Sequence, residues 1–215
     1  MLDNSLTEDE RMLRALVRDF ADHELAPRAQ EVDEQEEFSW ENWTGMSKLG
    51  LTGIGIDPAY GGTEGGYRQV AITAEEVARG DASASVSLIA HLSLGTSTIY
   101  RFGNEEQKQK FIPDLASGEK VAAWALTEPG GGSDAAALQT TAVMREGNYF
   151  LNGNKIFITN GDVADNIVVF ATLNRTQGYK GVSAFIVPND SPGLEINPQH
   201  GKLGIKGSST AELVF

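Results

Sequence analysis

Hydrophobic and polar residues follow different patterns in the two parts of the chain. In the first part, apolar residues recur at intervals of three and four, which is typical of amphipathic helices. The clearest example is the set Leu13, Leu16, Val17 and Phe20. From Val121 onward, short apolar runs follow one another at roughly ten-residue spacing, which is typical of an antiparallel barrel or sandwich. The pattern predicts an α+β chain, with an all-α domain over residues 1–118 and a β domain over residues 119–215.

Start and stop signals divide the first part into separate helices. Thr7 and Glu10 have the spacing of a capping box. Asp81 can cap the mostly uncharged stretch that follows it, whose small residues indicate a helix buried on most sides. A last helix begins at Asn104, and we expect it to end at Pro113, because proline lacks the backbone N–H that a helix interior requires.

The second part contains a series of short predicted strands. They are Val121 to Leu126, a hairpin within 143–154, and further strands at 155–161, 166–172, 182–187, 194–196 and 211–215. The sequence stops at Phe215 without a turn or cap after the last of them. We therefore expect the natural chain to continue.

Composition and charge exclude several classes of function. The chain has 215 residues, no cysteine and a formal net charge of −13. Most of this negative charge lies in the first 118 residues, which contain 21 acidic and 10 basic side chains. This balance argues against a nucleic-acid partner, since phosphate binding needs clustered basic residues. No run of eighteen apolar residues or secretory signal is present, so we expect no membrane span. The predicted location is cytoplasmic, or the mitochondrial matrix if a transit peptide has been removed.

The three histidines carry no pattern of a metal site. His23, His91 and His200 are far apart in the sequence, and no ligand spacing connects them. We expect no metal. His91 lies inside the buried helix and is interpreted as a hydrogen-bonded core residue.

Two segments of the β part combine aromatic rings with hydroxyl groups. Trp124-Ala-Leu-Thr-Glu-Pro-Gly-Gly-Gly-Ser-Asp134 leads from a strand into a glycine turn, whose exposed N–H groups and hydroxyls could bind a polar ligand. Phe157-Ile-Thr159 places a second ring beside a second threonine. On these residues alone, the first segment could equally be a long polar turn, and together they indicate that a planar polar ligand could bind.

The same two segments resemble signatures of a known family. Leu126 to Asp134 is similar to the first signature of the acyl-CoA dehydrogenases, and Leu151 to Gly161 is similar to their second flavin segment. Four further stretches occur in the family's order, namely Pro58 to Gly62, Glu75 to Arg79, Phe102 to Lys108 and Lys202 to Thr210. The resemblance covers the whole chain and is strongest to short-chain, butyryl-type members.

The resemblance implies a helical N-terminal domain, a β middle domain and a helical C-terminal domain, of which the third is absent from this sequence. The residues that would line the cofactor FAD are Trp124, Ala125, Leu126, Thr127, Gly132, Ser133, Phe157, Ile158 and Thr159. Thr127 and Thr159 would bind the isoalloxazine ring, and Phe157 stands where many members carry tryptophan. Ser133 would also meet the acyl-CoA substrate, and Lys180 and Gly181 resemble positions that contact its CoA part.

The implied reaction is the α,β-dehydrogenation of an acyl-CoA, with electrons passed to an electron-transfer flavoprotein by a homo-oligomer that is a tetramer in the family. The base that takes the α-proton is usually a glutamate of the third domain. Glu128 and Asp134 are the only acids in the flavin motif, and we interpret both as organising the turn. The chain alone is therefore expected to be inactive. Two alternatives stay open: an oxidase or monooxygenase on the same scaffold, and a non-catalytic interaction module.

Overall fold

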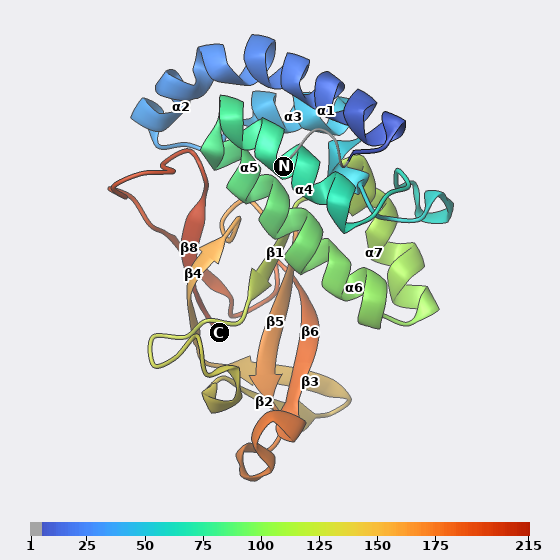
Figure 1. The fold of residues 1–215 in the computed structure, drawn as a ribbon. Helices are drawn as coiled ribbons and strands as arrows, with labels where there is room; N and C mark the ends of the chain where they lie inside the picture. The colour runs from blue at the N-terminus through green and yellow to red at the C-terminus, as the bar shows by residue number, and fades with distance from the viewer. Residues whose placement is uncertain (1–5) are drawn as a thin grey trace.

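Helices and strands occupy separate regions of the protein, as Figure 1 shows for the computed structural model, which describes residues 6–215. The helices are α1 (Glu8–Phe20), α2 (Ala29–Gln35), α3 (Trp40–Lys48), α4 (Tyr67–Gly80), α5 (Ala82–Ile89), α6 (Ser97–Phe102) and α7 (Glu105–Ser117). The strands are β1 (Ala122–Ala125), β2 (Thr141–Arg145), β3 (Asn148–Asn152), β4 (Asn154–Thr159), β5 (Asn166–Thr172), β6 (Val182–Pro188), β7 (Glu195–Pro198) and β8 (Thr210–Val214).

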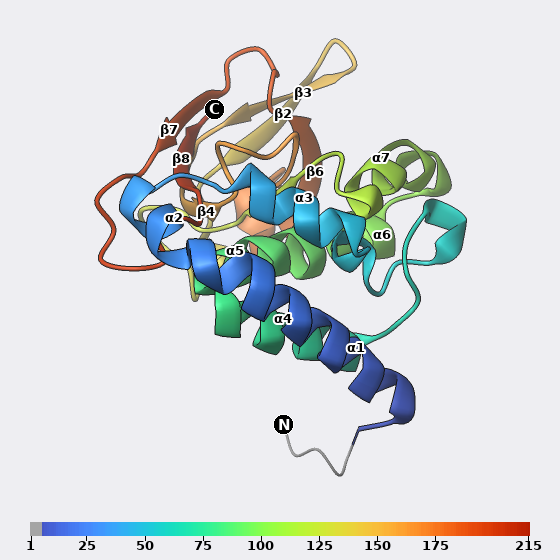
Figure 2. The same cartoon turned by 90° about the horizontal axis from the view of Figure 1, so that it is seen from above.

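Side-chain caps fix where the helices begin. The Thr7 hydroxyl accepts from the Glu10 N–H, and the Glu10 carboxylate accepts from the Thr7 N–H, which confirms the predicted capping box. Asp81 caps α5 by accepting from the N–H of Ser83. A π-helical segment, Ala90–Thr96, joins α5 to α6, so the three form one long helix. Viewed from above, α1 lies along α4 (Figure 2).

The prediction that the last helix ends at Pro113 is wrong. α7 runs through this proline for another turn and ends at Gly118, whose φ of 76° closes the helix. Proline in a helix interior costs about 3 kcal/mol. Ile112 and Leu115 on either side of it are fully buried, and each contributes about 1.5–3 kcal/mol of burial free energy. Tertiary packing therefore outweighs the local preference.

The strands form two sheets, which confirms the predicted α+β fold class with a mostly antiparallel β part. One sheet has the order β1-β5-β2-β3 with β6 also paired to β5, and the other has the order β4-β8-β7. The β1–β5 pair departs from the antiparallel expectation, because its strands run parallel. The connection between them is long enough for this arrangement, since it contains β2, β3 and β4.

Helices and strands pack together in two hydrophobic clusters. The larger cluster contains residues from both parts of the chain. Its buried members include Val17, Trp43 and Val77 from the helices and Val121, Ile167 and Leu213 from the strands. The division into domains at residues 118 and 119 thus falls within a continuous core and stays a prediction. Within residues 6–215, no helix is both long and apolar enough to cross a membrane.

His91 connects the helical part to the first strand. It is fully buried, as predicted for a core residue. Its Nδ1 accepts from the Ala122 N–H at 3.0 Å, and its Nε2 lies 3.0 Å from the carbonyl oxygen of Leu115. These contacts require a neutral ring that is protonated on Nε2. Burial lowers the pKa of His91 from 6.5 to about 4.

The lowered pKa of His91 predicts that acid weakens the fold. The unfolded chain binds a proton near pH 6.5 and the folded chain only near pH 4, so this contribution is complete above pH 6.5 and is lost as the pH falls toward 4. The full effect is about 3 kcal/mol. A His91→Gln variant should be less stable than the parent protein at pH 7. Its stability, measured by thermal unfolding, should also change less between pH 6.5 and pH 4.

His23→Gln is the matched control, because His23 is exposed on the helical part. It should keep the pH dependence of the parent protein. An unchanged pH dependence in the His91 variant would contradict the assignment.

Candidate functional site

The structure brings the two signature segments into direct contact. The N–H of Ile156 on β4 donates to the carbonyl oxygen of Thr127, just after β1, at 2.9 Å. Lys155 Nζ donates to the carbonyl oxygen of Leu126 at 2.9 Å. Residues that lie 29 positions apart in the sequence therefore bring the two segments together into one continuous surface.

A β-bulge turns Phe157 away from the core. The pairing register of β4 with β8 shifts between Lys155 and Ile158, and both of these side chains are buried. In a regular strand they would point to opposite faces, so the extra residue re-aims the side chain between them. Phe157 is 65% exposed and has a φ of 60°.

The backbone at Phe157 is strained. For a residue other than glycine, the left-handed conformation costs about 1–2 kcal/mol. Such strain persists where the surrounding structure imposes it, and it is common at ligand sites. An exposed aromatic ring held in this way, next to Thr127, provides a surface on which a planar ligand could stack.

The glycine turn is held by its own backbone hydrogen bonds, and its glycines are exposed. Glu128 and Gly131 exchange backbone hydrogen bonds of 2.9 and 3.0 Å. A Cβ built on Gly130 would meet nothing within 4 Å, and one built on Gly132 would lie 3.4 Å from the Thr127 side chain. Asp134 accepts from the N–H of Ala136 at 3.2 Å, in keeping with its predicted role in the turn.

Glu128 is an anchor for the turn. Its carboxylate accepts from Lys155 at 2.8 Å and from the N–H groups of Thr140 and Gln139. Burial raises the pKa of Glu128, but the hydrogen bonds from Lys155, Thr140 and Gln139 outweigh this effect and leave the pKa below its usual value. A catalytic base works best with a pKa near the operating pH, so Glu128 is unsuited to removing an α-proton.

The residues predicted to bind the cofactor differ in their solvent exposure. Gly132, Ser133 and Phe157 are exposed, and Trp124, Leu126, Thr127 and Thr159 are half-buried. Ala125 and Ile158 are buried in the core, so they offer only backbone groups to a ligand. Trp124 packs edge-on against Phe170, with 5.0 Å between ring centroids. The assignment of these residues to FAD stays a prediction.

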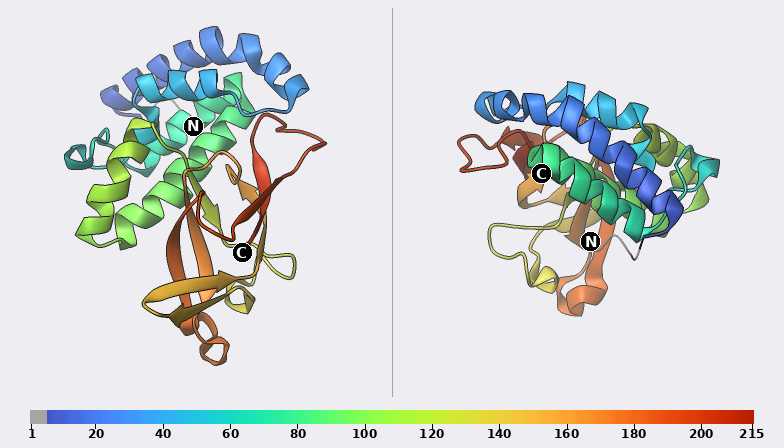
Figure 3. Two further views of the ribbon diagram at one scale, coloured as in Figure 1. Left: turned by 180° about the vertical axis from the view of Figure 1, so that it is seen from behind. Right: turned by 45° about the horizontal axis from the view of Figure 1, so that its top comes forward.

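The predicted CoA positions lie near the end of the glycine turn. Lys180 is exposed and Gly181 is buried, in a 3₁₀ segment that packs against Ala135–Ala137. Arg175 in the same segment donates to the carbonyl oxygen of Gln139 at 2.6 Å. Together with the β2–β3 hairpin, this segment forms the end of the molecule farthest from the helices (Figure 3).

One functional residue was missed in the sequence. The sequence pattern predicts only a strand at Lys155, yet this residue is completely buried and holds both Glu128 and Leu126. A lysine inside an otherwise apolar strand was the available signal, because such a residue is rarely buried without a partner.

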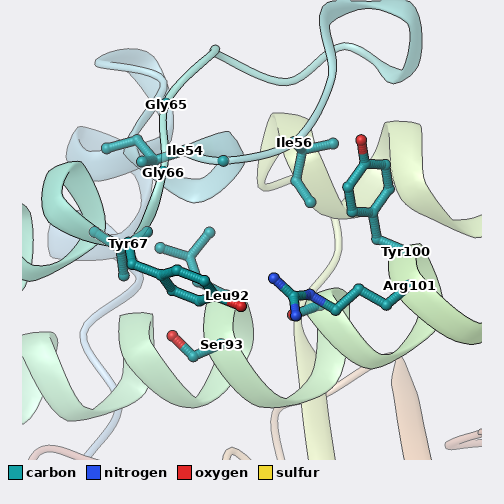
Figure 4. A pocket seen from close by; sticks show the side chains of 12 residues that line it. Ile54, Ile56, Gly65, Gly66, Tyr67, Leu92, Ser93, Tyr100 and Arg101 are labelled. Carbon is teal, nitrogen blue, oxygen red and sulfur yellow. The ribbon is translucent and has the colours of Figure 1, made fainter.

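A separate cavity of about 130 Å³ lies in the helical part. Figure 4 shows the Arg101 guanidinium close to the Tyr67 ring among the residues that line it, and the Arg101 Cζ lies 5.1 Å from the ring centroid. Gly65 and Gly66 contribute to its wall. None of the lining residues belongs to the two signature segments, so this cavity is distinct from the predicted cofactor surface.

Comparisons with known proteins identify the family to which the chain belongs. Models of the acyl-CoA dehydrogenase N-terminal domain and middle domain match residues 7–119 and 123–215. The chain therefore belongs to the acyl-CoA dehydrogenase family, as its motifs predicted.

Individual relatives resemble the chain over its whole length. It is 46% identical over 214 residues to the short-chain specific acyl-CoA dehydrogenase of Clostridium acetobutylicum, covering 100% of this chain and 56% of that protein. Butyryl-CoA dehydrogenase from Megasphaera elsdenii has 38% identity and a TM-score of 0.93, covering 100% of this chain and 57% of that one. A chain in a structure of the electron transferring flavoprotein of Acidaminococcus fermentans has 41% identity and a TM-score of 0.95, with coverages of 100% and 56%. The chain thus spans little more than half the length of these relatives.

Because the backbone at Phe157 is strained, we expect a Phe157→Gly substitution not to destabilise the fold. Phe157→Gly should keep the free energy of unfolding or raise it by about 1 kcal/mol, because the left-handed conformation costs glycine nothing. Phe150→Gly is the control, since Phe150 is also an exposed aromatic strand residue but has no positive φ. It should destabilise the fold. Chemical denaturation measures both, and a clear loss of stability in the Phe157 variant would contradict the strain.

Proposed function

We propose that the full-length protein is an FAD-dependent dehydrogenase of short-chain acyl-CoA thioesters. The observation that carries this proposal is the contact between the two signature segments, in which the Ile156 N–H binds the Thr127 carbonyl. This contact brings the exposed ring of Phe157 and the two threonines, Thr127 and Thr159, onto one surface. The short-chain substrate follows from the names of the similar proteins in Clostridium acetobutylicum and Megasphaera elsdenii.

The residues present fit an isoalloxazine ring. Phe157 offers an exposed aromatic face, and the Thr127 hydroxyl forms no hydrogen bond to any described residue, which leaves it free to bind a ring heteroatom. The open space at Gly130 lets a ligand approach the backbone of the turn. When bound, FAD supplies the two-electron acceptor for the dehydrogenation. Ser133 and Lys180, both exposed, would meet the acyl-CoA.

The base of the reaction would come from outside the signature segments. Their two acids, Glu128 and Asp134, are both hydrogen-bonded within the turn. Removal of an α-proton requires a base within hydrogen-bond reach of the substrate. In this proposal residues 1–215 position the cofactor, and a carboxylate elsewhere in the full-length protein removes the proton.

An electron-transfer flavoprotein is the proposed electron acceptor. The similarity to a chain from the Acidaminococcus fermentans electron transferring flavoprotein structure supports this pairing. A homo-oligomer, tetrameric as in the family, is the proposed assembly, in the cytoplasm or the mitochondrial matrix.

An activity assay separates the roles of this chain and of the full-length protein. With FAD, butyryl-CoA and an artificial electron acceptor, the full-length protein should turn over, and the 215-residue chain alone should show no activity above background. Turnover by the chain alone would contradict the assignment of Glu128 as an anchor. Absence of turnover by the FAD-loaded full-length protein would contradict the proposed reaction.

Oxygen consumption distinguishes a dehydrogenase from an oxidase or monooxygenase. The full-length protein, reduced by butyryl-CoA, should react slowly with oxygen and rapidly with an electron-transfer flavoprotein. Stopped-flow absorbance of the flavin measures both rates. Faster reaction with oxygen would favour the oxidase or monooxygenase alternative.

A further inference from the structure

An enclosed ion pair lies between the two signature segments. Lys155 has no exposed surface and Glu128 is 6% exposed, and Lys155 Nζ lies 2.8 Å from Glu128 Oε1. The same Nζ donates to the carbonyl oxygen of Leu126 at 2.9 Å. One ammonium group therefore holds the backbone just before Thr127 and the carboxylate just after it.

The Glu128 carboxylate also reaches the far end of the glycine turn. Its Oε1 accepts from the Thr140 N–H at 2.9 Å, and its Oε2 accepts from the Gln139 N–H. Of the intervening residues 129–138, only Leu138 is buried. Both ends of an exposed loop are thus attached to one carboxylate, so the position of the loop depends on where Lys155 holds that carboxylate.

These contacts fix the peptide planes on both sides of Thr127. The carbonyl oxygen of Thr127 accepts from Ile156, and that of Glu128 accepts from the Gly131 N–H at 3.0 Å. With the Leu126 carbonyl bound by Lys155, three successive carbonyl groups are held within the protein. The backbone that carries the Thr127 side chain is therefore held in one position.

Stability alone does not explain a buried ion pair at this place. Removing two charges from water costs several kcal/mol per ion, and apolar residues of similar volume often serve as well or better. Apolar residues, however, cannot form the directional bonds that hold the Leu126 carbonyl and the N–H groups of Gln139 and Thr140, just before β2. The pair therefore contributes geometry that packing cannot supply.

We propose that the Glu128–Lys155 pair is a positioning device for the flavin ring. Acting through Thr127 and the glycine turn, it sets the direction of the groups that bind the ring, although neither Glu128 nor Lys155 touches the ring itself. This inference rests on the proposed function, since it takes FAD as the ligand.

The test compares FAD binding by variants of the full-length protein. Glu128→Gln/Lys155→Met removes both charges and nearly keeps the two volumes. FAD titration of the apoprotein should give a dissociation constant that is about tenfold higher or more, by analogy with the loss of metal affinity when residues that orient metal ligands are changed. The absorption maxima and midpoint potential of the remaining bound flavin should shift, which a purely structural role would not cause. The apoprotein should unfold within a few degrees of the parent temperature.

Asp114→Asn/Lys120→Met is the matched control, because it removes another ion pair, which is partly exposed and lies outside both signature segments. It should bind FAD like the parent protein. If the first double variant does not fold, Glu128→Asp replaces it, since this change keeps the charge and shortens the reach, and it should also weaken FAD binding.

The outcomes separate the inference from the proposed function. If the parent protein binds no FAD, the proposed function fails. If the parent binds FAD and a folded Glu128 variant binds it within twofold, with unchanged spectrum and potential, the positioning role is wrong.

Discussion

The buried ammonium group of Lys155 is the constraint on which the site depends. A charge without exposed surface must be paired and hydrogen-bonded, and Lys155 meets this requirement only by drawing Glu128 and the Leu126 carbonyl toward β4. The glycine turn after β1 is thereby attached to β4 through two residues that lie 27 positions apart in the sequence. The surface assigned to the cofactor exists because these two segments cannot separate without exposing or unpairing a charge.

The same region combines rigid and strained parts. The bulge that brings Lys155 and Ile158 to the inside turns Phe157 outward in a left-handed conformation. His91 connects the long helix to the start of β1 by accepting a hydrogen bond from the Ala122 N–H. The ligand-facing groups are therefore held from the core side by buried polar contacts, while their outer face is open. This arrangement suits the preorganised binding of a planar cofactor.

Much of the fold could be predicted from the sequence, because caps and periodicity are local signals. The Thr7 capping box and the short strands agree with the structure. The helix through Pro113 was missed because burial, a tertiary effect, outweighed a local rule. In the site, the pairing of the two segments was predicted through their family resemblance. The Lys155 contact and the outward turn of Phe157 depend on a bulge whose register only the folded sheet reveals.

A crystal structure of the full-length protein grown with FAD would locate the cofactor directly. We expect the isoalloxazine ring to lie on the surface formed by β1 and β4, with the Thr127 and Thr159 hydroxyls at hydrogen-bond distance from it and Phe157 at its edge or face. A ring bound elsewhere, for example in the cavity beside Tyr67 and Arg101, would contradict the assignment of these two segments to FAD.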